Sequence, residues 1–155
     1  MEMVAMANAR RTNIKQIANF ASSAMVMITK AKAVTVRTID HVTGKLILQA
    51  KSGLGDEWIG RKTIHYNGSI IEAAASSGKP LKVRNLSSDS RYGSPSLARK
   101  NNLRSAFVVP LMVKGEPIGS FTLYFAHAHN LESLEEEFIE IFAQETAIAF
   151  KLTAK

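Results

Sequence analysis

The sequence predicts an α+β domain built on a central antiparallel β-sheet of five to six strands. Three features support this prediction: helical apolar spacing at both ends of the chain, two pairs of β-rich runs joined by short turns, and a long polar loop. Strands joined by tight turns run antiparallel, so the two long terminal helices must cover one face of the sheet. We expect the short helix and the loops to form a pocket on the other face.

The first 30 residues contain no Gly or Pro and predict an amphipathic helix. Its apolar residues recur at alternating spacings of three and four, which resembles a heptad seam: Ile14, Ile17, Ala21, Ala24 and Ile28. The helix is longer than one small sheet needs. We therefore assign residues 1–28 to a dimerisation and signalling helix that also pairs with a second copy, and residues 29–155 to the sheet domain.

A first hairpin is predicted from β-branched runs at 33–40 and 45–52, with a turn at 41–44. A glycine-rich loop carrying Trp58 follows. We expect a short helix over 70–77, capped by Asn67 or Ser69 and ended by Gly78.

In the second half of the sequence we predict a strand at 80–84 and a polar loop over 85–102. A hairpin follows, in which strands at 104–113 and 118–125 are joined by a turn at 114–117. A loop of that length needs a functional explanation, and we interpret it as a lid over the pocket. The last helix is expected to begin with a capping box at Ser133 and Glu136. Its predicted apolar stripe comprises Leu134, Phe138, Ile141, Phe142, Ile148, Ala149 and Leu152.

Composition excludes several classes of chemistry. The 155 residues are 46% hydrophobic and 21% charged, as in an ordinary globular domain. There is no cysteine, which excludes disulfides, cysteine-bound metal, thiol nucleophiles and thioether-linked chromophores. No apolar run is long enough to span a bilayer and the N-terminus lacks a secretory signal, so we expect a cytoplasmic protein without membrane attachment.

The net charge of +7 is unevenly distributed. Residues 79–104 contain seven basic side chains and one acid, Asp89, whereas residues 132–145 contain six glutamates and no base. The simplest interpretation is two solvated faces of opposite sign, and an anionic small ligand near the lid is the second. Nucleic-acid binding is not expected, because no aromatic residues are interleaved with the bases and no binding motif is present.

Alternation along the strands assigns side chains to the two faces of the sheet. Phe121, Leu123 and Phe125 should face the terminal helices, which places Ser120, Thr122 and Tyr124 on the pocket side. On the first strand, Thr35 and Arg37 should share that side.

The loops supply the other candidate ligand-binding residues. Arg91, Tyr92 and Ser94 lie in the lid, where a cation and an aromatic ring would grip a planar or anionic ligand. Trp58 lies in the glycine-rich loop, and His65 and Ile70 lie around the start of the short helix. The alternatives are structural: Tyr124 fills the cavity, Arg37 pairs with Asp40, Trp58 pins its own loop, and His65 caps local backbone.

Several segments together resemble a GAF domain, from about residue 29 to the C-terminus. They are Gly78-Lys-Pro-Leu81, Val83-Arg-Asn-Leu86, Asp89-Ser-Arg-Tyr92, Arg104-Ser-Ala-Phe-Val-Val-Pro-Leu111, Gly115-Glu-Pro-Ile-Gly119 and Ala147-Ile-Ala149, with Gly53 and residues 64–75 before them. The resemblance implies a GAF/PAS-like fold. It also implies a sensory module of a bacterial signalling protein, such as a sensor histidine kinase of a two-component system. Such a module binds a small molecule between sheet and loops and forms a homodimer through its terminal helices.

Further implications of the resemblance concern ligand and context. Bilin-binding members and free-methionine-sulfoxide reductases of this fold use cysteine, so a covalently attached bilin and that enzyme are not expected. The Asn-Lys-Phe-Asp-Glu signature of cyclic-nucleotide-binding members is absent. The cofactor and the identity of the ligand are unknown. Haem or iron sensing stays open because His41, His65, His127 and His129 are present, although the last two are more typical of a solvated link than of a metal site.

We expect no catalysis, because no Ser-His-Asp set, carboxylate pair or glycine-rich nucleotide motif occurs. The output domain, a kinase or another effector, would belong to a longer protein of which this chain is a fragment, or the chain acts alone. A ligand-free dimerisation or protein-interaction module is the alternative function.

Overall fold

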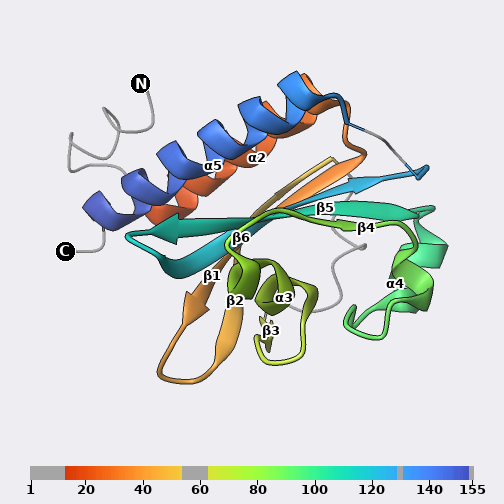
Figure 1. Ribbon diagram of the computed structural model, residues 1–155, viewed down its shortest axis with the longest axis horizontal. Coiled ribbons are helices and arrows are strands. Elements are labelled where there is room, and N and C mark those ends of the chain that lie inside the picture. Colours follow the sequence, from red (N-terminus) through yellow and green to blue (C-terminus); the bar gives the residue numbers. More distant parts are fainter. Residues whose placement is uncertain (1–12, 54–62, 129–130, 154–155) are drawn as a thin grey trace.

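The computed structural model describes residues 13–53, 63–128 and 131–153. It has three layers, with one sheet between a pair of long helices and a set of short elements (Figure 1). The helices are α2 (Ile14–Thr29), α3 (Ile70–Ser77), α4 (Pro95–Lys100) and α5 (Ser133–Thr153), with a 3-10 turn η2 (Leu86–Ser88). The strands are β1 (Ala33–Asp40), β2 (Lys45–Ser52), β3 (Thr63–His65), β4 (Leu81–Val83), β5 (Ser105–Val113) and β6 (Glu116–Phe125). The predicted α+β class is confirmed.

The sheet has six strands in the order β3-β2-β1-β6-β5-β4, and every neighbouring pair is antiparallel. Both predicted hairpins, β1–β2 and β5–β6, are confirmed. The second turn is tighter than expected, because Lys114 and Gly115 both take positive φ values of 52° and 80°, as two-residue hairpin turns require.

The two hairpins join through β1 and β6 at the centre of the sheet, where Val36 pairs with Phe121 and Arg37 with Ser120. Gly119 permits this close approach, because a Cβ atom there would lie 2.2 Å from the carbonyl oxygen of Arg37. Any side chain at this position would push the two strands apart.

The helix side of the sheet holds the larger apolar core. Phe121, Leu123 and Phe125 face α2 and α5 as predicted, and Ile17 and Ala21 of α2 are fully buried against them. The rings of Phe121 and Phe142 lie 6.3 Å apart between their centroids, a favourable distance for an aromatic pair.

The predicted apolar stripe of α5 was mostly wrong. Of its seven members only Phe142 and Ala149 are buried, while Leu134, Phe138, Ile141, Ile148 and Leu152 are exposed. The core-facing side consists of Ile139, Phe142, Ala143, Thr146, Ala147, Ala149 and Phe150. The helix has two apolar stripes, and the stripe rich in alanine packs against the sheet because small side chains allow a closer approach.

Two local predictions also need correction. Ser133 is the first helical residue of α5 rather than its cap, and the Glu132 backbone N–H donates to Glu135 Oε1 at 3.1 Å. The predicted lid is a structured segment containing η2 and α4, because Leu86 and Ala98 are fully buried and anchor it. In contrast, α3 matches its prediction, with Ser69 as the N-cap and Gly78 at the C-terminus. No helix in the described ranges has the length and apolarity that a membrane span requires.

Candidate ligand pocket

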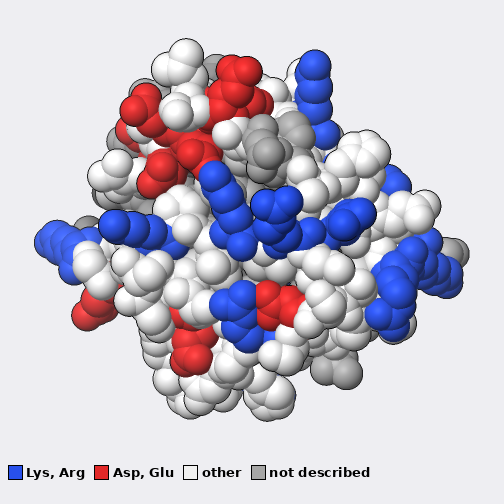
Figure 2. All heavy atoms as spheres, turned by 45° about the vertical axis from the view of Figure 1, so that its right-hand side comes forward, with Lys and Arg blue, Asp and Glu red and all other residues white. Residues whose placement is uncertain are grey.

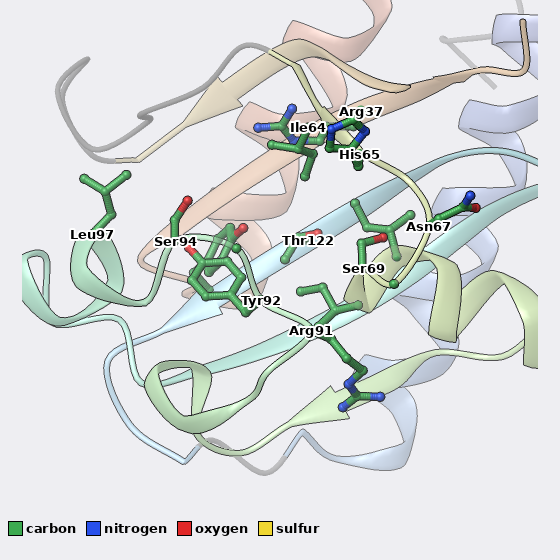
Figure 3. Close-up of a pocket in the computed structure, with 15 residues that line it drawn as sticks. Arg37, Ile64, His65, Asn67, Ser69, Arg91, Tyr92, Ser94, Leu97 and Thr122 are labelled. Atoms are coloured by element: carbon green, nitrogen blue, oxygen red, sulfur yellow. The ribbon is translucent and has the colours of Figure 1, made fainter. Parts of the chain in front are cut away.

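A cavity of about 220 Å³ lies on the face of the sheet opposite α2 and α5 (Figure 3). Strands β1, β3 and β6 form one side of it, and the start of α3 together with residues 91–97 forms the other. The lining residues are Arg37, Ile64, His65, Asn67, Gly68, Ser69, Ile70, Ile71, Arg91, Tyr92, Gly93, Ser94, Leu97, Thr122 and Tyr124.

The sheet supplies its side chains by alternation, as predicted. Arg37 from β1 and both Thr122 and Tyr124 from β6 line the cavity, while their neighbours along the strands lie in the core beneath the helices. Thr35 is buried and alternates with Val34 and Val36 of the helix-side core, which places it on the pocket side. Ser120 lies opposite Arg37 and is 1% exposed, and its Oγ finds no hydrogen-bond partner among the described residues.

Tyr92 joins the lid segment to the floor of the cavity. Its ring centroid lies 6.4 Å from that of Tyr124, with the planes tilted by 60°. Burial raises the pKa of both phenols, so both remain neutral at physiological pH. Tyr92 therefore holds the lid in place and presents an aromatic surface to the cavity.

Arg91 lines the cavity as predicted and also forms an ion pair with Asp89. Its Nε and a terminal nitrogen donate to the two carboxylate oxygens of Asp89 at 2.9 and 2.6 Å. The hydrogen bond from Arg91 is the main reason that the pKa of Asp89 lies below its usual value. Figure 3 shows the Arg91 guanidinium pointing away from Thr122 and Tyr92.

Arg37 is the cation buried at the cavity, and the residue is only 8% exposed. Burial lowers its pKa, because leaving water disfavours the charged form, and the fields of Tyr124 and Tyr92 oppose this effect. A guanidinium nevertheless stays protonated in proteins, so Arg37 keeps a positive charge at the pocket wall. Asp40, its predicted alternative partner, accepts the backbone N–H groups of Val42 and Thr43.

Three more predicted residues meet at the cavity: His65 from β3, Ile70 from α3 and Ser94, which precedes α4. Trp58 lies outside the described residues. Sequence reasoning missed Ile64, Asn67, Gly68, Ser69, Ile71, Gly93 and Leu97 as lining residues. The Asn67-Gly-Ser69 turn before the short helix was a usable signal, because it places polar groups at the end of a strand beside a helix start.

The other histidines are spread over the molecule. His41 lies in the exposed turn between β1 and β2, with its Nε2 3.1 Å from the carbonyl oxygen of Pro117. The carbonyl of His127 accepts the Ser105 hydroxyl, and His129 lies outside the described residues. The residues that the structure describes contain no group of three His, Cys, Asp or Glu side chains able to hold a metal ion.

The predicted separation of charge is visible on the surface. Figure 2 shows a band of Lys and Arg side chains across one face, next to a cluster of Asp and Glu. All seven basic residues between 79 and 104 are exposed. The Nζ atom of Lys82 lies 2.6 Å from Glu136 Oε1, so the two charged regions meet at an ion pair.

Residues 11–151 match the GAF domain family. A comparison with curated proteins finds no significant relative.

Solved structures share the fold at low sequence identity. The GAF domain of a phosphoenolpyruvate-protein phosphotransferase from Coxiella burnetii superposes with a TM-score of 0.80 at 19% identity, covering 97% of this chain and 89% of that one. A domain of a putative two-component sensor histidine kinase from Sinorhizobium meliloti gives 0.72 at 14% identity, with coverage of 90% and 92%. A free methionine-R-sulfoxide reductase from Neisseria meningitidis, solved with its substrate, gives 0.72 at 16% identity, with coverage of 95% and 91%.

Proposed function

Because the chain belongs to the GAF domain family, whose members are generally small-molecule-binding modules, we propose that it is a non-catalytic sensor domain of a bacterial signalling protein. The observation that carries this proposal is the cavity between the sheet and residues 91–97. The cavity combines apolar walls with a few polar side chains, as small-molecule sites do.

The sheet offers a route from the cavity to the terminal helices. Strand β1 presents Arg37 to the pocket and Val36 to the helix-side core, and β6 does the same with Thr122 and Phe121. A ligand that shifts these two central strands would change the packing surface of α2 and α5. We propose that the terminal helices pass this change to an output domain.

One of the proteins with a similar structure is a reductase, so the proposal that this chain is not an enzyme needs separate support. The sequence contains no cysteine, hence no thiol for redox chemistry. Burial also keeps the two tyrosine hydroxyls at the cavity protonated, so neither of them is an activated nucleophile.

The first test is native mass spectrometry of gently purified protein, compared with its denatured mass. We expect an additional small-molecule mass in the native spectrum. Adding that compound to ligand-free protein should raise the melting temperature and slow amide exchange in residues 86–101.

A variant that fills the cavity tests whether the ligand binds there. A Cβ atom at Gly93 would meet nothing within 4 Å and its φ is not positive, so Gly93→Phe adds bulk at the pocket without backbone strain. We expect it to lower affinity at least tenfold. Ser90→Phe is the matched control, because Ser90 is exposed in the same segment and does not line the cavity. Equal affinities in the two variants would place the ligand elsewhere.

A second candidate function, dimerisation without a ligand, is favoured by the outer stripe of α5. Its exposed apolar residues recur at spacings of four, three, seven and four: Leu134, Phe138, Ile141, Ile148 and Leu152. This is the spacing of a coiled-coil seam. Ile28 of α2 joins the stripe, because it lines a shallow apolar groove with Leu134 and Phe138. A second copy of the chain would bury these side chains.

Sedimentation of the double variant Ile141→Glu/Ile148→Glu tests this function. We expect the wild type to dimerise and the variant to be monomeric with an unchanged fold. Val42→Glu serves as control, since Val42 is 95% exposed at the tip of the β1–β2 hairpin, away from the terminal helices. A wild type that stays monomeric at high micromolar concentration would eliminate a dimerisation role.

A further inference from the structure

We propose that two copies of this chain pair through the outer stripes of their α5 helices, and that the two helices run antiparallel. This inference rests on the dimerisation described above as the second candidate function, and it adds the orientation of the partner and the residues that select it. The orientation follows from the spacing of the stripe, from one charge within it and from the charges along one of its flanks.

The outer stripe lies on the side of α5 that faces away from the sheet. Figure 1 shows α5 beside α2 in the outer layer of the molecule. Leu134 and Ile141 are 77% and 60% exposed, whereas Ile139 and Ala143 on the inner side are buried in the core. A continuous row of exposed apolar side chains indicates an interaction surface. A helix with the same pattern would bury the row along its whole length.

The stripe contains one charged residue. Glu145 follows Ile141 by four residues and precedes Ile148 by three, so it fills the gap in the heptad pattern. This spacing places Glu145 in the same row as the apolar side chains, at a core position of a coiled coil. The residue is already half-buried, and it takes part in no ion pair among the described residues. Its charge therefore determines what can face it.

A parallel pair would oppose like charges. In that orientation equal positions face each other, so Glu145 would meet Glu145 of the second copy. Two carboxylates buried face to face repel each other, and their removal from water adds to the cost in free energy. The start of α5 would also lie beside its own copy. That segment is rich in glutamates: Glu135, Glu136, Glu137 and Glu140.

An antiparallel pair centred on residue 143 removes this conflict. Leu134 then faces Leu152 of the second copy, and each layer joins an early member of the stripe to a late one. Glu145 faces Ile141 instead of another carboxylate. The glutamate-rich starts of the two helices lie at opposite ends of the pair. The pattern of the stripe is therefore compatible with itself in this orientation.

One flank of the stripe favours the same orientation. Glu137, Gln144 and Lys151 are exposed and recur every seven residues beside the stripe. In an antiparallel pair this flank faces the same flank of the second copy, so Glu137 meets Lys151 twice and Gln144 meets its own copy at the two-fold axis. In a parallel pair Glu137 and Lys151 would stay about 21 Å apart along the helix axis. Charge complementarity along the flank thus selects a second copy in antiparallel orientation.

Cysteine cross-linking tests the orientation, because the chain has no cysteine of its own and each introduced thiol is unique. Under mild oxidation of the whole chain we expect Gln144→Cys to form a disulfide-linked dimer. An equal mixture of Leu134→Cys and Leu152→Cys should form the mixed disulfide. Leu152→Cys alone should stay unlinked, because its two copies lie about 27 Å apart along the helix axis. Val42→Cys, at the exposed tip of the β1–β2 hairpin, is the control for random collisions.

Charge reversal tests the flank. We expect Glu137→Lys and Lys151→Glu each to raise the dimer Kd at least fivefold in sedimentation equilibrium at low salt, because each replaces two attractions by two repulsions. The double variant should return to within about twofold of the wild type, and the single losses should shrink at high salt. Glu140→Lys makes the same charge change on the same helix outside the flank, and it should leave the Kd within about twofold.

Replacing the charge within the stripe gives an independent measurement. Glu145→Leu should lower the Kd at least tenfold, because a charged core residue costs stability in the paired state. It should also allow the parallel pair, so that Leu152→Cys begins to cross-link on its own in this background. A Kd that rises instead would mean that Glu145 gains a partner across the interface, which contradicts the arrangement described here.

The remaining results separate the orientation from dimerisation itself. If Leu152→Cys cross-links on its own in the otherwise wild-type chain while Gln144→Cys does not, the pair is parallel; the orientation fails and dimerisation stands. A double charge variant as weak as the single variants would show that Glu137 and Lys151 do not meet. A wild type that sediments as a monomer even at high micromolar concentration would leave the stripe to a different partner and refute both the orientation and the dimerisation.

Discussion

The two faces of the sheet are made by the same strands and differ in almost every other respect. Toward α2 and α5, β1 and β6 present Val34, Val36, Phe121 and Leu123, all fully buried in the larger core. Toward the pocket, the same strands present Thr35, Arg37, Ser120 and Thr122, which are buried as well but polar. One face maximises apolar contact, while the other buries a charge and leaves the Ser120 hydroxyl without a partner among the described residues.

This difference separates stability from recognition. Apolar burial on the helix side stabilises the fold, whereas buried polar groups on the pocket side cost free energy unless hydrogen bonds or an opposite charge compensate. In natural proteins, buried polar groups and imperfect packing occur chiefly at functional sites. The following predictions test whether the division between the faces is as sharp as the structure indicates.

The largest effect should come from truncating a helix-side ring. Phe121→Ala removes a fully buried side chain that packs on Phe142, and we expect a loss of about 3–5 kcal/mol of unfolding free energy. The next residue faces the pocket, and Thr122→Ala should cost about 1 kcal/mol. Urea unfolding of both variants measures the contrast, and similar losses would contradict the division between the faces.

A smaller effect should follow from separating the central strands. Gly119→Ala places a Cβ 2.2 Å from the Arg37 carbonyl oxygen, so β1 and β6 must move apart. We expect this separation to lower the free energy of unfolding by about 1–3 kcal/mol. The variant should also weaken ligand binding, because Arg37 moves with its strand. Gly93→Ala is the control and should stay within about 1 kcal/mol of the wild type, since its Cβ meets open space. An unperturbed Gly119→Ala would mean that the strands can separate freely.

The pocket-side helix should depend on one cap. Ser69 Oγ accepts the Glu72 backbone N–H at 3.1 Å, so Ser69→Ala should cost about 1 kcal/mol. Amide exchange should rise in α3 and remain unchanged in α5. Ser69→Asp restores an N-cap acceptor and should recover most of the loss, whereas a variant as unstable as Ser69→Ala would show that the hydroxyl acts in another way.

The smallest effect should be the pH dependence of the lid. The pKa of Asp89 is lowered by Arg91, so the pair stabilises the folded state above the usual carboxyl pKa of about 4 and loses that contribution as pH falls through the lowered value. The Arg91 side chain is 40% exposed, and solvent screening limits the contribution to below about 1 kcal/mol. Asp89→Asn should therefore melt slightly below the wild type at pH 7, and the difference should vanish near pH 2. A constant difference would exclude the ion pair as its cause.

Much of the site could be predicted because it depends on local periodicity. Successive side chains of a strand point to opposite faces, so the run from Gly119 to Phe125 placed Thr122 and Tyr124 on one side before any pairing was known. Turn and cap chemistry located the hairpins and α3 in the same way. These features need only the conformational preferences of neighbouring residues.

Other features depended on contacts between distant segments. The sequence could not reveal which apolar stripe of α5 packs on the sheet, because Leu134, Ile141 and Ile148 are more hydrophobic than the alanines that actually face it. Nor could it show that Asp89 turns the Arg91 guanidinium away from the cavity while Arg37 stays buried beside it. By itself the sequence determined the elements and the faces of the strands. The tertiary structure decided which helix surface is buried and which side chains line the cavity, because both depend on how closely distant backbones can approach.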